Sequence, residues 1–96
     1  MPSSQSAPWR VLLADDHAML REGLALLVNS QPDMKVVGQA GDAKEAIQLA
    51  RTLQPHIAVI DVSMPEGGGA EAAAAIVRDS PDVRVLALTR HADQAT

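Results

Sequence analysis

The sequence predicts an α/β fold, a doubly wound parallel sheet with helices on both faces, and three observations predict it. Aliphatic runs without alternation, such as 11–14 and 57–60, are typical of strands that are buried on both faces. These runs alternate with helix-like segments at a spacing typical of right-handed βαβ units. Acidic residues follow two of the runs, at the strand ends where open α/β sheets bind their ligands.

Length and composition indicate one small domain. We expect a flexible tail over 1–8 and a single core over 9–96. No cysteine is present, which excludes disulfides and thiolate metal sites. The sequence has no apolar stretch of membrane-spanning length and no signal-peptide pattern, so we expect a cytoplasmic protein without membrane contact. The formal net charge of −4 argues against nucleic-acid binding by this segment itself, because phosphate contacts need clustered Lys and Arg.

The first half of the chain is predicted to form a strand over 10–16, a helix over 18–29 and a short strand over 35–39. The helix is indicated by an apolar stripe at helical spacing. That stripe consists of Leu20, Leu24, Leu27 and Val28. Pro32 lies shortly after the helix and favours its end.

A second helix is predicted to begin after Asp42, an N-cap residue that Glu45 follows at capping-box spacing. Pro55 ends this helix, and a buried strand follows over 57–62. The residues expected to face inward are Ala46, Ile47, Ala50 and Leu53.

The last predicted elements are a flexible loop over 65–69, an Ala-rich helix over 71–78 and a fourth buried strand over 83–89. Three consecutive glycines indicate the loop, and they do not match a phosphate-cradling glycine-rich loop. Ile76 and Val77 are expected to anchor the helix in the core.

Three aspartates indicate the functional site. Asp15 and Asp16 end the first strand and Asp61 ends the third, so the carboxylates meet if the two strands are neighbours. Like charges raise one another's pKa unless a cation lies among them. Hard oxygen ligands of this kind suit Mg²⁺, which keeps several waters. The alternatives are that the acidic pair only caps the next helix and that Asp61 is a turn residue.

Four segments together carry a resemblance to a known family. They are 11–17 (VLLADDH), 20–24 (LREGL), 60–65 (IDVSMP) and 85–89 (VLALT). In combination they resemble the receiver domain of two-component response regulators, most of all those of the NarL/LuxR-type transcriptional regulators. The resemblance implies a flavodoxin-like fold with strand order 2-1-3-4, and a fifth strand after these.

The resemblance also implies a role for each site residue. Asp61 would accept a phosphoryl group from a phosphohistidine of a sensor histidine kinase. Asp15, Asp16 and Asp61, with the backbone carbonyl of Ser63, would hold Mg²⁺. The Thr89 hydroxyl would hydrogen-bond the phosphoryl group and act as a switch. Such a domain is not an enzyme in its own right; it controls a DNA-binding effector.

The sequence departs from the family pattern at its end. Receivers continue through a fifth strand that bears a Lys and a switch aromatic, then a fifth helix, and NarL/LuxR-type regulators add a helix-turn-helix. This chain stops at Thr96, and neither Lys35 nor Lys44 is expected in the place of the missing Lys. We therefore expect a truncated receiver whose apolar strand 83–89 lies at a sheet edge, where it favours self-association as a dimer.

Two other classes remain open at this point. A haloacid-dehalogenase-like phosphatase also places carboxylates after its first strand, although it spaces them as Asp-x-Asp, whereas Asp15 and Asp16 are adjacent. The second is a receiver-like module that is not phosphorylated and serves only protein contacts. The three histidines, His17, His56 and His91, show no metal-ligand spacing, and we expect solvated or capping roles for them.

Overall fold

The computed structural model describes residues 7–64 and 68–89. The tail predicted over 1–8 therefore lies mostly outside the described residues, as does His91. Within the described part, strands and helices alternate as the sequence predicts. The elements are β1 (Trp9–Ala14), α1 (Ala18–Asn29), β2 (Met34–Ala40), α2 (Ala43–Leu53), β3 (Ile57–Asp61), α3 (Gly68–Asp79) and β4 (Arg84–Leu88).

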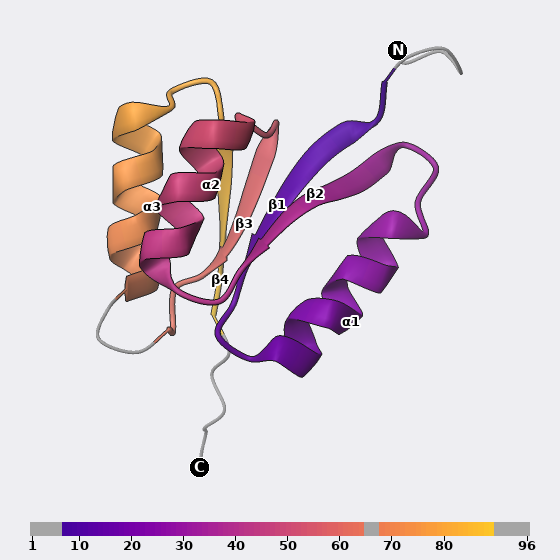
Figure 1. Ribbon diagram of the computed structural model, residues 1–96, viewed down its shortest axis with the longest axis horizontal. Coiled ribbons are helices and arrows are strands. Elements are labelled where there is room, and N and C mark those ends of the chain that lie inside the picture. The colour runs from indigo at the N-terminus through magenta and orange to yellow at the C-terminus, as the bar shows by residue number, and fades with distance from the viewer. Residues whose placement is uncertain (1–6, 65–67, 90–96) are drawn as a thin grey trace.

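The strands form one parallel sheet with the order β2-β1-β3-β4 (Figure 1), which confirms the predicted order. The central strand pair sets the geometry of the site. Ala14 in β1 lies opposite Ile60 in β3, so the chain continues from these partners into Asp15 and Asp61 at the same edge of the sheet. β1 and β3 are therefore neighbours, which is the condition on which the predicted meeting of the carboxylates depends.

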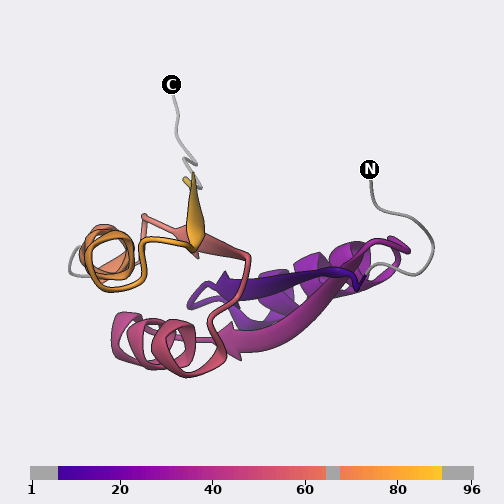
Figure 2. The same ribbon diagram turned by 90° about the horizontal axis from the view of Figure 1, so that it is seen from above.

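Helices cover both faces of the sheet. α2 and α3 pack side by side against one face, and α1 packs chiefly against β1 and β2 on the other (Figures 1 and 2). The larger core lies on the α2–α3 side, where alanines let the helices approach the sheet closely. Its buried members are Leu12, Ala14, Ala40, Ala46, Ala50, Ala58, Ile60, Met64, Ala72, Ile76 and Val83.

The core on the α1 side is smaller, and here the predicted stripe is partly wrong. Leu24 and Val28 pack toward the sheet, but Leu27 is 65% exposed and Leu20 is 41% exposed. Ala25 is the buried residue of α1, so the sheet-facing side of the helix is centred on Ala25. Leu27 lies two positions further on, about 200° around the helix from Ala25, and points away from the sheet.

The predicted capping box of α2 is confirmed at its first bond. Glu45 N–H donates to the Asp42 carboxylate at 2.8 Å. The Glu45 carboxylate in turn accepts from the backbone N–H of Gly41 at 2.9 Å, one residue before the position expected. At the other end, Gln54 adopts a left-handed conformation with φ 46° and closes the helix before Pro55.

Two predicted boundaries are wrong. β1 ends at Ala14, before the acidic pair, because the chain turns there toward α1. α3 begins at Gly68 and includes Gly69, which were expected to form a loop. A β-carbon on Gly69 would overlap the backbone of Asp61 and Val62, so glycine is required by this close approach.

The anchor predicted at Val77 is also wrong. Ile76 is buried, as expected, but Val77 is 56% exposed. Neighbouring helical residues point about 100° apart, so both could face the core only if α3 were covered on two sides.

Candidate functional site

The three predicted aspartates lie at the same carboxyl edge of the sheet, and the group of close ligand atoms there consists of Asp15, Asp16 and His17. Asp15 and Asp61 are buried, with 3% and 1% of their surface exposed, and they follow or end neighbouring strands. Asp16 is more open, with a side chain 28% exposed. Buried carboxylates are uncommon in proteins unless they are paired or ligate a metal. This burial distinguishes the site from an ordinary acidic surface.

A tight turn holds the acidic loop, residues 15–17. The Asp15 carboxylate accepts a hydrogen bond from the backbone N–H of His17 at 2.8 Å. This bond resembles the capping role that was one alternative for the acidic pair, and it directs the chain into α1. His17 itself occupies the N-cap position of α1, without a side-chain capping bond.

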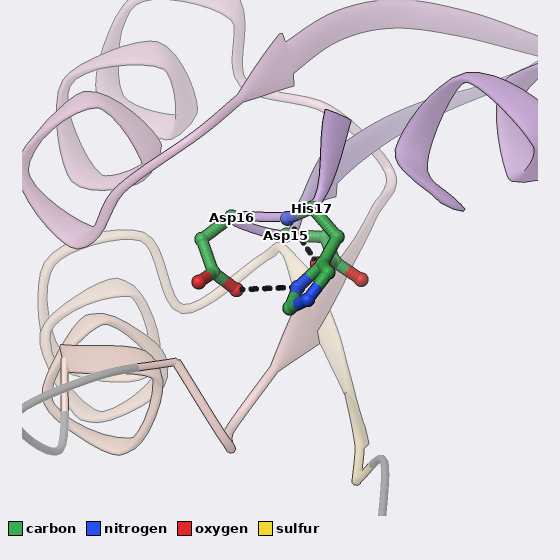
Figure 3. A group of neighbouring side chains, drawn as sticks. All are labelled: Asp15, Asp16 and His17. Carbon is green, nitrogen blue, oxygen red and sulfur yellow. Dashed lines mark hydrogen bonds and ion pairs between the residues drawn. The ribbon is translucent and has the colours of Figure 1, made fainter. Parts of the chain in front are cut away.

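His17 was expected to have a solvated or capping role, and it is exposed at the N-cap of α1, but the sequence analysis did not predict its contact with the acidic pair. Its ring nitrogen Nδ1 lies 3.3 Å from an Asp16 carboxylate oxygen and 3.8 Å from one of Asp15 (Figure 3). The three side chains offer ligand atoms that all lie within 4.8 Å of one another. Adjacent residues rarely bind one metal ion together, so the sequence spacing did not suggest that His17 joins Asp15 and Asp16. The turn after β1 brings the imidazole ring next to the two carboxylates.

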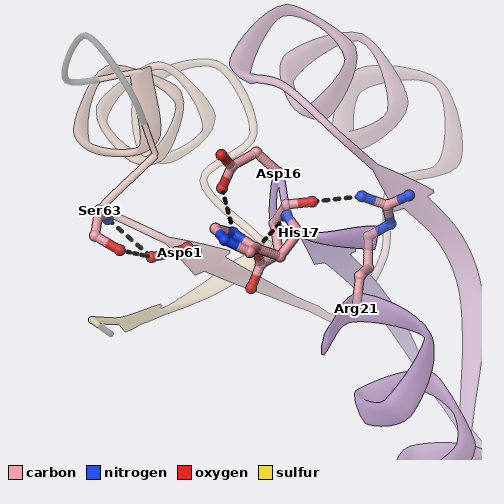
Figure 4. A network of polar contacts seen from close by, with 6 residues as sticks. Asp16, His17, Arg21, Asp61 and Ser63 are labelled. Atoms are coloured by element: carbon pink, nitrogen blue, oxygen red, sulfur yellow. Dashed lines mark hydrogen bonds and ion pairs between the residues drawn. The ribbon is translucent and has the colours of Figure 1, made fainter. Parts of the chain in front are cut away.

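The second part of the site is the end of β3. The Asp61 carboxylate accepts two hydrogen bonds from Ser63, one from its backbone N–H at 2.8 Å and one from its hydroxyl at 2.5 Å (Figure 4). The close packing of Gly69 in α3 against the Asp61 backbone adds a rigid support from behind. Together these contacts fix both the main chain and the side chain of the predicted phosphoacceptor.

Thr89 lies at the same edge of the sheet. Asp61 is paired in register with Leu88 of β4, so Thr89 is the residue that follows the partner of Asp61. Thr89 is exposed, immediately beyond the strand. Its proposed role as a switch stays a prediction.

Arg21 is a further polar residue of the site. Its guanidinium donates to the backbone carbonyl of Asp15 at 2.5 Å (Figure 4). It also donates to the Gln39 side chain at 3.2 Å. It therefore joins α1 to the acidic loop and to the end of β2.

A hollow of about 430 Å³ lies beside Asp16, between the starts of α2 and α3. Lys44 contributes to its lining, although the sequence analysis had set Lys44 aside as a positive charge for the site. The other lining residues are Gly41, Asp42, Ala43, Met64, Gly68 and Glu71.

The donor set fits Mg²⁺. Asp15 and Asp16 present carboxylate oxygens close together, and Asp61 lies at the same sheet edge on the neighbouring strand. Mg²⁺ prefers hard oxygen ligands and needs only one or two carboxylates besides water. The His17 imidazole is a softer donor, which Mg²⁺ does not need.

Comparison with known proteins identifies the family. Residues 11–96 match the family described as "Response regulator receiver domain". The chain belongs to this family. Within it, the chain is a receiver domain of the LuxR/NarL type, since its relatives are transcriptional regulators of that type.

Curated relatives are about 40% identical to this chain over the residues that match. The transcriptional regulatory protein LiaR of Bacillus subtilis is 42% identical over 84 residues, which are 88% of this chain and 40% of LiaR. The DNA-binding transcriptional activator DevR/DosR of Mycobacterium tuberculosis is 39% identical over 82 residues, 85% of this chain and 38% of DevR/DosR. The chain thus spans about 40% of the length of the curated relatives that it matches.

Solved structures agree. The signal receiver domain of the response regulator NarL from Mycobacterium tuberculosis has a TM-score of 0.82 and 33% identity, over 91% of this chain and 70% of that one. A LuxR-family response regulator from Aurantimonas sp. SI85-9A1 has a TM-score of 0.82 and 39% identity, over 88% of this chain and 61% of that one. The flavodoxin-like receiver fold is confirmed.

Membership settles the alternatives left open by the sequence. Neither the phosphatase nor the module without phosphorylation is supported by these relatives. Receiver domains bind Mg²⁺ at their acidic phosphorylation site, interact with histidine kinases and, in transcriptional regulators, are in general not enzymes. Among the described residues, no helix combines the length and apolar character needed to span a membrane.

Proposed function

We propose that this domain is the phosphoacceptor of a two-component system, taking a phosphoryl group from a sensor histidine kinase onto Asp61. The observation that carries the proposal is the placement of Asp61. It is a buried carboxylate at the end of β3, held by Ser63 and lying at the same sheet edge as the acidic loop. The role is that of a signalling domain, not of an enzyme that turns over a substrate.

The transfer is an exchange of one bond for another. A carboxylate oxygen of Asp61 attacks phosphorus, the phosphorus–nitrogen bond to the kinase histidine breaks, and an acyl phosphate forms. Phosphoryl transfer depends mainly on positioning and charge neutralisation. The two hydrogen bonds from Ser63 hold the Asp61 carboxylate in one orientation, which supports the positioning requirement.

Asp15, Asp16, Asp61 and the backbone carbonyl of Ser63 would hold Mg²⁺. When bound, the ion neutralises the charge shared by the carboxylates and the incoming phosphoryl oxygens. The turn at His17 keeps the Asp15 carboxylate near the sheet edge, and the burial of Asp15 and Asp61 keeps competing water away. The Thr89 hydroxyl would donate a hydrogen bond to the new phosphoryl group and carry the change to the surface near β4.

The rest of the pathway follows from the relatives. Their names describe transcriptional regulators, so we propose that phosphorylation here controls a DNA-binding helix-turn-helix effector outside the 96 residues. Such a regulator works in the cytoplasm, where both the kinase and the DNA are reached.

Self-association through β4 is part of the proposal. β4 is the last strand in the sheet order, and Leu86 on it is 55% exposed. An apolar sheet edge favours pairing with a second chain, so we expect the 96-residue chain to form a dimer. Sedimentation equilibrium at micromolar concentration tests this expectation. Leu86→Lys should weaken the association, and a monomer at all concentrations would contradict it.

The phosphoacceptor role is tested with beryllofluoride, which mimics a phosphoryl group on a carboxylate. With Mg²⁺ present, amide resonances of Asp61 and Thr89 should shift in an NMR titration of the chain. Asp61→Asn should abolish the shifts, whereas the matched control Asp79→Asn, on the exposed end of α3, should leave them intact. Unchanged spectra for the folded wild type would overturn the proposal.

A further inference from the structure

Arg21 links three parts of the site through one side chain. Its NH1 group donates a hydrogen bond to the backbone carbonyl of Asp15 at 2.5 Å (Figure 4). Its Nε donates to the Gln39 side chain at 3.2 Å. The same NH1 group lies 3.4 Å from the place of a β-carbon on Gly41. α1 is thereby tied to the residue that follows β1 and to the end of β2, and the Arg21 guanidinium lies beside the turn that follows β2.

The carbonyl that Arg21 contacts belongs to the peptide unit between Asp15 and Asp16. A peptide unit is planar, so holding its carbonyl oxygen also holds the nitrogen and the α-carbon of Asp16. The N–H of Asp15 still bonds β2 through the Ala40 carbonyl at 3.0 Å. Asp16 lies beyond the paired part of β1, so this peptide unit, together with the contact of the Asp16 carboxylate with His17, holds it in place.

We propose that Arg21 is a positioning residue of the metal site, which orients the Asp16 carboxylate by holding the Asp15–Asp16 peptide. This inference rests on the proposed function, because it concerns the same Mg²⁺ site. A guanidinium suits the task, since its rigid fork of donors bonds two acceptors at once, which the single ammonium of a Lys does not reproduce. Partners behind metal ligands typically change metal affinity by about ten- to a hundredfold when removed.

Charge and positioning predict opposite results here. Arg21 is a cation close to a cation site, so by Coulomb repulsion alone its removal should tighten Mg²⁺ binding. Loss of positioning should weaken binding instead. The sign of the change in affinity, measured where each variant is folded, therefore separates the two effects.

The experiment is a Mg²⁺ titration of the 96-residue chain by calorimetry, with the thermal midpoint of each variant measured without Mg²⁺. Arg21→Gln should weaken Mg²⁺ binding by about tenfold. Arg21→Lys, which keeps the charge and loses the fork, should also weaken it. The matched control is Arg78→Gln, which removes the same charge from the exposed end of α3, where Arg78 pairs with Asp79, and it should leave the affinity unchanged.

Gln39→Ala gives a second test without any change of charge. It removes the side-chain acceptor that steadies the Arg21 guanidinium, and it should weaken Mg²⁺ binding in the same direction by a smaller factor. This variant and Arg21→Lys decide the question even if Arg21→Gln does not fold. Unchanged or tighter binding in them overturns the role of Arg21 while the proposed function stands. A wild-type chain that is folded and binds no Mg²⁺ overturns the proposed metal site itself.

Discussion

The two faces of the sheet are built differently. On the α2–α3 side, small alanines and a few large side chains such as Ile60 and Ile76 form one continuous buried cluster. On the α1 side, the buried cluster is limited to Val11, Leu13 and Ala25. α1 contacts chiefly β1 and β2, so the β3–β4 half of that face is less covered and Leu86 stays exposed.

The difference extends to the outer surface of the helices. α1 exposes large apolar side chains on its outer side, among them Met19 at 89% and Leu26 at 74%. α2 instead has a polar outer side and complete caps at both ends. The comparison teaches that stability is concentrated in the α2–α3 half, whereas the α1 half retains apolar surface beside the functional loop.

The largest difference in the free energy of unfolding is expected when one apolar side chain is truncated in the α2–α3 core and another on the outer side of α1. Ile76→Ala should lower the free energy of unfolding by about 2–5 kcal/mol, because it leaves a cavity in the larger core. Leu26→Ala, on the outer side of α1, should change it by less than about 0.5 kcal/mol. Urea denaturation followed by circular dichroism measures both. Equal effects would show that α1 is covered in solution.

A second contrast compares the same substitution at two helical glycines. Gly69→Ala should destabilise the fold by about 1–3 kcal/mol, because its β-carbon would overlap the backbone of Asp61 and Val62. Gly23→Ala in α1 should stabilise it by about 1 kcal/mol, since nothing lies within 4 Å and alanine favours helix. Thermal unfolding of the two variants checks the opposite signs; a shift in the same direction would contradict the proposed packing of α3.

The helix starts provide a third contrast. Asp42→Ala should lower the free energy of unfolding by about 1 kcal/mol, because it removes the side-chain hydrogen bond to the backbone of Glu45. α1 has no side-chain capping bond at its N-cap, so His17→Ala should cost clearly less. Urea midpoints of the two variants, compared at equal ionic strength, test this order. A larger loss for His17→Ala would mean that the imidazole stabilises the acidic loop.

The smallest effect concerns the link between α2 and α3. The hydrogen bond from Arg78 holds the pKa of Asp79 below its ordinary value, and Arg51 on α2 adds to this effect. A lowered pKa contributes stability above about pH 4, and that contribution is lost as pH falls through the folded pKa. Asp79→Asn should therefore slightly reduce the acid sensitivity of the thermal midpoint between about pH 7 and pH 3. The effect is small because Asp79 is exposed to solvent.

Much of the fold could be predicted because local patterns and tertiary packing agree in it. The buried strands, the capping residue Asp42 and the neighbouring carboxylates Asp15 and Asp61 all follow from runs and spacings along the chain. Parallel strands bring their carboxyl ends to one edge, so a motif after β1 and a motif after β3 had to meet once the strands were neighbours.

Other features depend on tertiary packing and on the geometry of one turn. Gly69 is helical because α3 packs on the Asp61 backbone, and a glycine run alone is equally typical of a loop. Leu27 is exposed because the sheet, not the periodicity, decides which side of α1 is covered. Arg21 and His17 lie in segments that carry the family resemblance, but their contacts with the acidic loop come only from the folded chain, since any residue supplies the backbone carbonyl that Arg21 bonds and a turn brings His17 to Asp16.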